Sequence, residues 1–172
     1  MLPIRKSLRL KNYDYSKPAS FFVTICVYKM ENLFGKISNG KRKLNDFGLI
    51  VKRHWLNNPI IRPNTKNDEF IIMPNHFHGI ITIKTCAEAY CNTPLHNTPL
   101  QFKSPSQTLG AIIRGFKGAT TNDINLVRHT PGKRLWLRNY YDNIIRTEKS
   151  FTNFRQYIIN NPVNFSLNTT FS

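Results

Sequence analysis

The chain has 172 residues, and its 25 lysines and arginines outnumber its nine aspartates and glutamates, which gives a net charge of +16 at pH 7. This length can bury a hydrophobic core without disulfide or metal staples, and we expect one domain over residues 1–172. The basic excess favours a polyanionic partner, above all nucleic acid, because neutralising phosphates releases condensed counterions.

The sequence argues against three other classes of protein. No apolar run approaches the roughly 18 residues of a membrane span, so we expect no membrane partner. The N-terminal residues lack the apolar core of a secretory signal, and we therefore expect a cytoplasmic protein. Cys26, Cys86 and Cys91 are odd in number and have no C-x-x-C spacing, which argues against a disulfide framework and a cysteine zinc site.

The first part of the chain predicts a strand followed by a helix. Residues 20–28, SFFVTICVY, are rich in aromatic and β-branched side chains, which is typical of a buried strand. In residues 44–58, apolar side chains recur at helical spacing after a capping position at Asn45 or Asp46.

The middle of the chain predicts a hairpin and then a loop. Residues 68–73 and 76–83 are strand-like, and the Pro-Asn pair between them indicates a turn, so we expect an antiparallel hairpin. Residues 84–107 are rich in Thr, Pro, Asn and Ser and contain the imperfect repeat NTPLH, NTPLQ. We interpret this segment as a variable surface loop.

The last part of the chain predicts a helix over residues 106–128, an extended segment over 134–146 and a final helix over 148–161 that Pro162 ends. The whole order is strand, helix, strand, strand, helix, strand, helix. This order predicts an α+β, ferredoxin-like antiparallel sheet (βαββαβ) with helices on one face, plus a C-terminal helix.

The stretch MPNHFHGIITI, residues 73–83, places two histidines one residue apart in a predicted strand. Because side chains alternate across a strand, His76 and His78 should point to one face and Phe77 to the other. Two imidazoles on one face can bind one metal ion, although such a pair is also compatible with a purely structural role.

The final predicted helix carries a second group of polar side chains. Phe151, Phe154 and Ile158 form an apolar stripe on it. Tyr157 and Asn161 lie at the margin of this stripe, one turn apart, so a hydroxyl and an amide oxygen should emerge side by side. The alternatives are a tyrosine that only packs and an asparagine that only ends the helix before a proline.

In their order and spacing, these motifs resemble the single-tyrosine HUH transposases, and within them the REP-associated tyrosine transposases of the IS200-like type. The segments that carry the resemblance are YDYSKPASFFVTICV, MPNHFHGIITI, LWLRNYYDNIIR and YIINNPV. It covers most of the chain except residues 84–107 and about the last ten.

The resemblance implies roles for four residues. His76 and His78 would be metal ligands on a central strand, Tyr157 the nucleophile on the C-terminal helix, and Asn161 the third ligand. Relatives also place Gln, Glu or His in the position of Asn161, and Asn160 is the neighbouring alternative.

The resemblance also implies a reaction: metal-dependent cleavage and strand transfer of single-stranded or stem-loop DNA through a covalent 5′-phosphotyrosine. A free tyrosine has a pKa of about 10 and is a poor nucleophile at neutral pH. A divalent cation on the phosphate oxygens compensates by polarising phosphorus. Two imidazoles, an amide oxygen and open positions suit Mg²⁺ or Mn²⁺.

Ten basic or aromatic residues are further candidates for contacts with DNA. The cluster around Trp136 has the basic and aromatic mixture that suits single-stranded nucleic acid, although Trp136 is equally compatible with the core. The ten candidates are Arg5, Lys6, Arg9, Lys11, Arg114, Lys117, Lys133, Arg134, Trp136 and Arg138.

Two other functions fit the same motifs. One is a catalytically idle DNA-binding regulator of the same fold, and the other is a small rolling-circle replication initiator, which uses the same histidine pair and tyrosine. The sequence leaves the oligomeric state open between monomer and homodimer, since the tyrosine helix of one protomer can serve the site of another.

Overall fold

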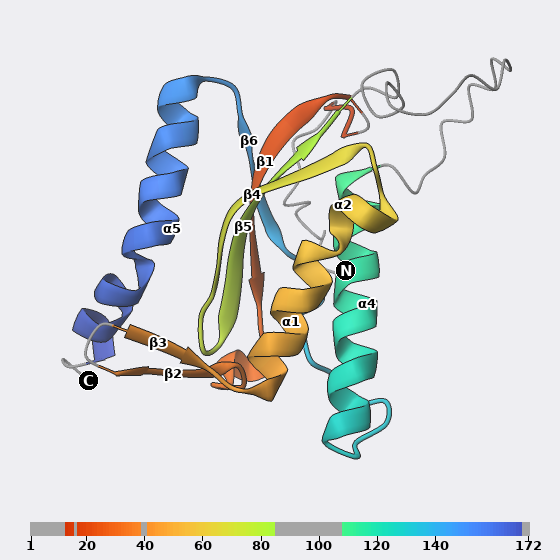
Figure 1. Cartoon of the computed structure of the whole chain (residues 1–172), viewed down its shortest axis with the longest axis vertical. Coiled ribbons are helices and arrows are strands. Elements are labelled where there is room, and N and C mark those ends of the chain that lie inside the picture. The colour runs from red at the N-terminus through yellow and green to blue at the C-terminus, as the bar shows by residue number, and fades with distance from the viewer. Residues whose placement is uncertain (1–12, 16, 39–40, 85–107, 170–172) are drawn as a thin grey trace, which may run out of the picture.

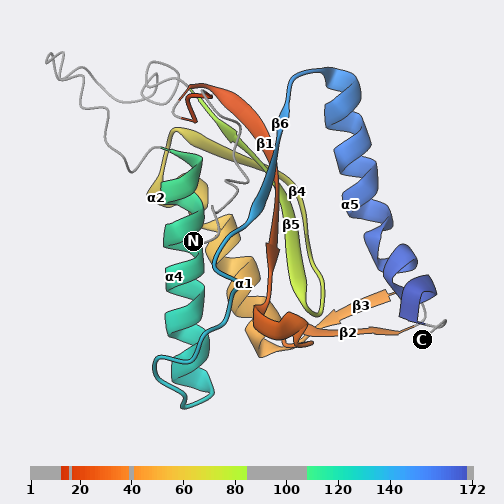
Figure 2. The same ribbon diagram turned by 180° about the vertical axis from the view of Figure 1, so that it is seen from behind.

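The computed structural model of the chain describes residues 13–15, 17–38, 41–84 and 108–169 (Figure 1). A single four-stranded sheet lies between two layers of helices. Two helices cover one face of the sheet, and the C-terminal helix covers the other, as the two opposite views show (Figures 1 and 2).

The sheet contains β1 (Ala19–Cys26), β4 (Thr65–Ile72), β5 (His76–Ile83) and β6 (Tyr141–Ile145) in the order β4-β5-β1-β6. All neighbouring strands are antiparallel. The predicted ferredoxin-like order is therefore confirmed, and β5, which carries the two histidines, is central as expected.

The first helical layer consists of α1 (Asp46–Leu56) and α4 (Leu109–Val127). Asn45 caps α1, because its side chain accepts a hydrogen bond from the backbone N–H of Gly48 at 3.0 Å. Of the two capping positions that the sequence left open, Asn45 is the one used. The layer buries a core under the sheet that includes Trp55, Phe21, Phe77 and Phe116.

Trp55 packs directly against β5 at Gly79. A Cβ atom at Gly79 would lie 2.7 Å from Cζ2 of Trp55, so any larger residue would push the helix from the strand. Burying a side chain of this size contributes roughly 1.5–3 kcal/mol. Because Gly79 has no side chain, Trp55 of α1 can pack closely against β5 next to the histidine pair.

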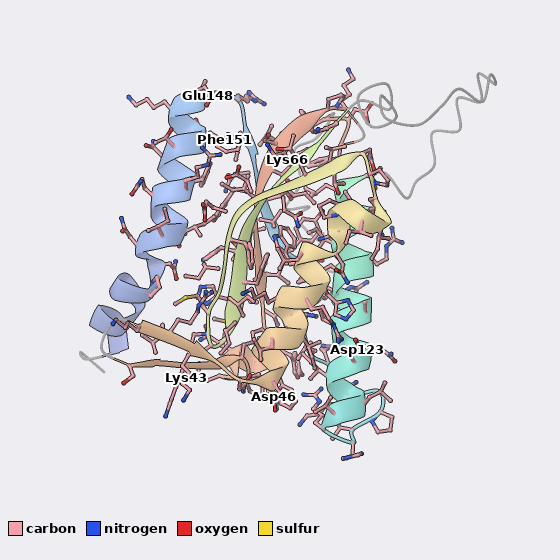
Figure 3. All side chains as sticks on the ribbon, viewed as in Figure 1. Lys43, Asp46, Lys66, Asp123, Glu148 and Phe151 are labelled. Atoms are coloured by element: carbon pink, nitrogen blue, oxygen red, sulfur yellow. The ribbon has the colours of Figure 1, made fainter. Side chains whose placement is uncertain are left out.

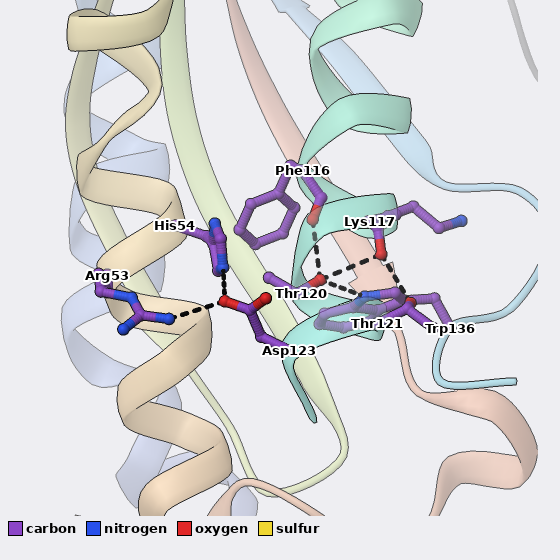
Figure 4. A network of polar contacts seen from close by, with 8 residues as sticks. All are labelled: Arg53, His54, Phe116, Lys117, Thr120, Thr121, Asp123 and Trp136. Atoms are coloured by element: carbon purple, nitrogen blue, oxygen red, sulfur yellow. Dashed lines mark hydrogen bonds and ion pairs between the residues drawn. The ribbon is translucent and has the colours of Figure 1, made fainter. Parts of the chain in front are cut away.

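Polar contacts join α1 to α4 (Figure 4). Asp123 accepts hydrogen bonds from Arg53 at 2.7 Å and from His54 at 2.8 Å. Deeper in the same layer, Trp136 Nε1 donates to Thr120 Oγ1 at 2.9 Å. The contacts of Asp123 hold α1 and α4 together, and the contact of Trp136 holds α4 to the segment before β6. All of them lie on the face of the sheet that does not carry the histidines.

The second layer is α5 (Glu148–Thr169), which packs against the sheet through a smaller core. Figure 3 shows Phe151 on the side of α5 that faces the strands. The prediction that Pro162 ends this helix is wrong, because α5 continues to Thr169 with Pro162 inside it. Proline removes one backbone hydrogen bond and bends a helix, but a helix can continue beyond it.

A two-stranded sheet that the sequence did not predict follows β1. It is formed by β2 (Gly35–Ser38) and β3 (Lys41–Leu44) and lies next to the lower end of α5 (Figure 1). Its strands are four residues long, and β3 reads KRKL, so no alternation of apolar and polar residues marked it. Two short helical turns also escaped prediction, η1 (Tyr28–Met30) and α2 (Asn58–Ile61).

Within the described residues, no helix has the length and apolar character needed to cross a bilayer. The predicted loop over residues 84–107 lies outside the described residues, apart from Lys84.

Candidate active site

The two histidines of β5 lie on the face of the sheet that α5 covers. Thr24 pairs with His78 and Cys26 with His76 in the register of β1 and β5, whereas Phe77 enters the core on the opposite face. The centroids of the two imidazole rings are 4.7 Å apart. The structure therefore brings His76 and His78 together, as the alternation of the strand predicts.

Each imidazole is oriented by a neighbouring side chain. Thr24 Oγ1 and Nδ1 of His78 are hydrogen-bonded at 2.8 Å, and Asn75 Oδ1 and Nδ1 of His76 are hydrogen-bonded at 2.7 Å. Hydrogen bonds at one ring nitrogen fix the ring and its tautomer, which is how metal-binding histidines are commonly held. With both Nδ1 atoms engaged in this way, Nε2 is the nitrogen suited to bind a metal.

Both histidines are neutral at pH 7. Burial lowers the pKa of His76 to about 4, against a smaller opposing effect of its hydrogen bond with Asn161. Burial lowers the pKa of His78 to about 3, and the neighbouring His76 adds to this effect. A neutral imidazole is the form that binds a metal ion.

Tyr157 of α5 lies directly beside this pair. Its ring centroid is 5.3 Å from that of His78 and 5.8 Å from that of Phe22. Phe22 stacks on His78 on one side of the site and on Phe154 on the other. Phe22 thus packs between α5 and the histidines of β5. The side chain of Tyr157 remains 46% exposed, so a substrate can reach it.

Asn161 reaches the same place one helical turn later. It is 6% exposed and shares a side-chain hydrogen bond with His76, whereas Asn160 is exposed. Because α5 continues past it, Asn161 does not end the helix. Its amide is directed at the histidine pair, which favours Asn161 over Asn160 as the third donor.

An ion pair fixes the register of α5 on the sheet. Arg155 donates two hydrogen bonds to the carboxylate of Asp68 in β4, at 2.7 and 2.6 Å. The guanidinium also lies over the ring of Phe151, 4.5 Å from its centroid. Because Arg155 is two residues before Tyr157, this contact limits how far the tyrosine can slide along the strands.

The donor set of the site is two imidazoles and one amide. Within the described residues, no group of three or more His, Cys, Asp or Glu side chains lies close enough to hold a metal ion. A metal at this site therefore depends on the amide oxygen of Asn161, or on the substrate, for further donors. The remaining positions are open to oxygens of phosphate and water.

A groove beside α4 is lined by most of the remaining candidates. Residues of α4 and of the segment that leads to β6 line it. Lys117 donates to the carbonyl of Arg138 at 3.2 Å, which joins the two walls. The basic residues that line the groove are Arg114, Lys117, Lys133, Arg134 and Arg138.

Trp136 has only 4% of its surface exposed and belongs to the core. Of its two interpretations, the structure therefore favours the packing role over contact with DNA. Four further candidates, Arg5, Lys6, Arg9 and Lys11, lie outside the described residues.

His54, another histidine that the structure describes, does not join the site. His54 is bonded to Asp123 on the far face of the sheet. The role of Thr24 and Asn75 in orienting the imidazoles was not predicted from the sequence. Asn75 adjoins the histidine motif, but nothing local marks Thr24, since its role arises from the pairing of two distant strands.

Comparison with known proteins places this arrangement in context. No protein-family model matches the chain. An uncharacterized protein of Haemophilus influenzae is 45% identical over 161 residues, covering 92% of this chain and 88% of that one. The solved structure of a REP-associated tyrosine transposase bound to a REP hairpin is 16% identical, with a TM-score of 0.62, over 91% of this chain and 74% of that one. The chain therefore belongs to one family with the Haemophilus influenzae protein and has the fold of the REP-associated tyrosine transposase.

Proposed function

We propose that the protein is a metal-dependent transposase-type nuclease that cuts and rejoins single-stranded DNA through a covalent bond to Tyr157. The observation that carries this proposal is the position of Tyr157, 5.3 Å from His78 between ring centroids, with Asn161 bonded to His76 one turn away. An exposed tyrosine thus lies beside two imidazoles and a buried amide, groups that are suited to act as a nucleophile and as metal ligands. A purely structural cluster has no need of this combination.

The fit of the site to a divalent cation rests on its donors. Neutral, oriented imidazoles and an amide oxygen suit Mn²⁺ or Mg²⁺ when phosphate and water oxygens supply the other positions. A bound cation would polarise the phosphodiester and offset the charge that develops on its oxygens. His76, His78 and Asn161 would hold it.

The chain's own residues supply the covalent chemistry. The hydroxyl oxygen of Tyr157 forms a bond to phosphorus as the bond from phosphorus to the 3′ oxygen breaks. The phenol loses its proton, and the departing 3′ oxygen takes one up from water. The products are a 5′-phosphotyrosine and a free 3′-hydroxyl, and attack by another 3′-hydroxyl reverses the step and joins the strands.

The substrate we propose is a stem-loop of single-stranded DNA. The solved relative of the same fold is bound to a REP hairpin, and the net charge of +16 of this chain suits a polyanion. The exposed cations of the groove, Arg114, Lys133, Arg134 and Arg138, would contact the phosphate backbone away from the site of cleavage. Contacts of this type position DNA without reading its sequence.

The candidate nucleophile and the histidine pair lie side by side within one chain. Tyr157 lies beside His78 of its own chain rather than on a helix that extends away. We therefore propose that one protomer can carry out the cleavage step in cis, whether the protein is a monomer or a homodimer.

Incubation with an end-labelled stem-loop in Mn²⁺ tests the proposal. We expect a protein–DNA adduct that survives denaturing electrophoresis, and we expect none after Tyr157→Phe. Tyr140→Phe is the matched control and should form the adduct normally. EDTA should abolish the adduct while leaving most of the binding.

Two outcomes would contradict the proposal. An adduct that persists in Tyr157→Phe would mean that another residue is the nucleophile. Tight binding of stem-loops with no adduct in any divalent metal would instead indicate a DNA-binding regulator of the same fold.

A further inference from the structure

Tyr141 is a large aromatic side chain on the open surface of the sheet. It is the first residue of β6, at the edge of the sheet, and 57% of its surface is exposed. The apolar part of a tyrosine is usually at least partly covered, so an aromatic edge residue this exposed is suited to contact a partner.

The register places Tyr141 in line with the candidate active site. Thr24 of β1 pairs with Tyr141 on one side and with His78 on the other. Residues directly paired across a sheet point to the same face, so Tyr141 lies on the α5 face with the histidines. With strands about 4.8 Å apart, its backbone is roughly 10 Å from that of His78.

The first residues of β6 are not covered by α5. The core beneath α5 includes Ile71, Ile80 and Ile145, but Tyr141 and Asn143, four and two residues before Ile145 on the same face of β6, are exposed. The exposed side chains of β6 are therefore separated from the histidine strand only by β1, where Thr24 is half-buried.

The segment that leads to Tyr141 also lines the basic groove. Arg138, one of the lining residues, precedes Tyr141 by three residues. The backbone just before Arg138 is fixed to the sheet, since the N–H of Leu137 donates to the carbonyl of Cys26 at 2.9 Å. A strand of nucleic acid that leaves the groove at Arg138 would thus meet the ring of Tyr141 before it reaches His78.

We propose that Tyr141 is a stacking platform for an unpaired base of the DNA strand that enters the active site. This inference rests on the proposed function for the nature of the site that the strand enters. Every nucleobase has a flat face that can stack on an aromatic ring, so the contact would align the strand without selecting its sequence. In this arrangement the groove binds phosphates of the strand, and Tyr141 stacks on one base that lies between the groove and the metal site.

Equilibrium binding without metal tests this role. The probe is a fluorescent stem-loop with a single-stranded extension, titrated in EDTA so that no cleavage occurs. We expect Tyr141→Ala to weaken binding roughly 5- to 150-fold, the range that corresponds to the loss of one stacked base. Tyr141→Phe should bind as the wild type does, because it keeps the ring.

Two further variants separate stacking from structure. Tyr141→Thr keeps high strand propensity but has no ring, so it should bind as weakly as Tyr141→Ala while melting at the wild-type temperature. Ile60→Ala removes another exposed apolar side chain, 78% exposed on α2, and should leave binding unchanged.

A scan with single abasic nucleotides locates the contact. In the wild type, removing the stacked base should weaken binding, and in Tyr141→Ala the same abasic nucleotide should have no further effect. The inference is overturned if Tyr141→Ala binds like the wild type, if Tyr141→Phe is as weak as Tyr141→Ala, or if every abasic effect persists in Tyr141→Ala.

The results of this binding test and of the adduct test distinguish failure of the Tyr141 proposal from failure of the proposed function. If the stacking result is negative while Tyr157 still forms an adduct, the proposed function stands and only the role of Tyr141 is lost. If no adduct forms but Tyr141 and one abasic position are coupled, the chain is a single-strand binder without the proposed chemistry.

Discussion

Asn161 of α5 and His76 of β5 are joined by a side-chain hydrogen bond, although 84 residues separate them in the chain. The bond places an amide at the histidine pair. We predict that Asn161→Ala weakens Mn²⁺ binding at least about 10-fold and slows adduct formation by a similar or larger factor. Titration calorimetry with Mn²⁺ measures the first effect.

The adjacent Asn160 provides the matched control. Its side chain is exposed, so Asn160→Ala should bind Mn²⁺ as the wild type does. Equal losses in the two variants would mean that Asn161 acts only through the packing of α5.

Thr24 should matter for metal binding because it orients His78. Thr24→Val keeps the shape of the side chain and removes the hydroxyl bonded to Nδ1 at 2.8 Å. We predict a 10- to 100-fold loss of Mn²⁺ affinity, a typical effect of losing such a partner, and near-normal binding in Thr24→Ser.

A similar hydroxyl pair elsewhere on the same two strands controls for stability. Ser20 and Thr82 are hydrogen-bonded at 2.8 Å. Thr82→Val should lower the melting temperature comparably to Thr24→Val yet leave Mn²⁺ affinity intact. If both variants lose metal, the effect comes from the sheet as a whole.

The ion pair of Asp68 with Arg155 should give stability a specific dependence on pH. The hydrogen bond from Arg155 holds the pKa of Asp68 below its ordinary value. The stabilisation is therefore fully present above the ordinary pKa of about 3.9 and disappears as the pH falls through the lowered value. Asp68→Asn should melt below the wild type at pH 7, and the difference should shrink at strongly acidic pH.

Tyrosine adduct formation is a second measurement for this pair. Since Arg155 fixes α5 near Tyr157, we expect Asp68→Asn to slow adduct formation without changing the affinity for stem-loop DNA. A melting difference that is the same at pH 7 and at pH 3 would show that the pair contributes no charge-dependent stability.

Asp123 should be important for stability and not for chemistry. Asp123→Ala removes the acceptor that binds both Arg53 and His54 and so loosens α1 from α4. We predict a loss of about 1 kcal/mol in the free energy of unfolding, measured by urea denaturation. Mn²⁺ binding should not change, because this network lies on the opposite face of the sheet.

The basic groove should contribute salt-dependent affinity. If Arg138 contacts a phosphate, Arg138→Gln should reduce the slope of log K against log salt by about 0.7, the value for one contact on a single strand. Lys52→Gln changes an exposed charge on α1, outside the groove, and should leave the slope unchanged. Equal slopes in all three proteins would remove Arg138 from the DNA interface.

The sheet and its helices were predictable because their signals are local. The strand-like apolar run of β5 and the helical spacing around Trp55 are signals of single elements, and both elements were confirmed. The β2–β3 hairpin was missed because charged residues dominate β3. The end of α5 was misplaced because the effect of Pro162 depends on the packing of the helix as well as on its own ring.

By itself, the sequence determined that His76 and His78 share a face of a strand and that Tyr157 and Asn161 share a side of a helix, since the backbone repeat fixes both. Only the tertiary structure decided that these two faces meet, because their contact depends on Phe22 seating α5 on the sheet and on the pairing of Arg155 with Asp68. The role of Thr24 and the alignment of Tyr141 likewise follow from strand register, which is set between elements that lie far apart in the chain.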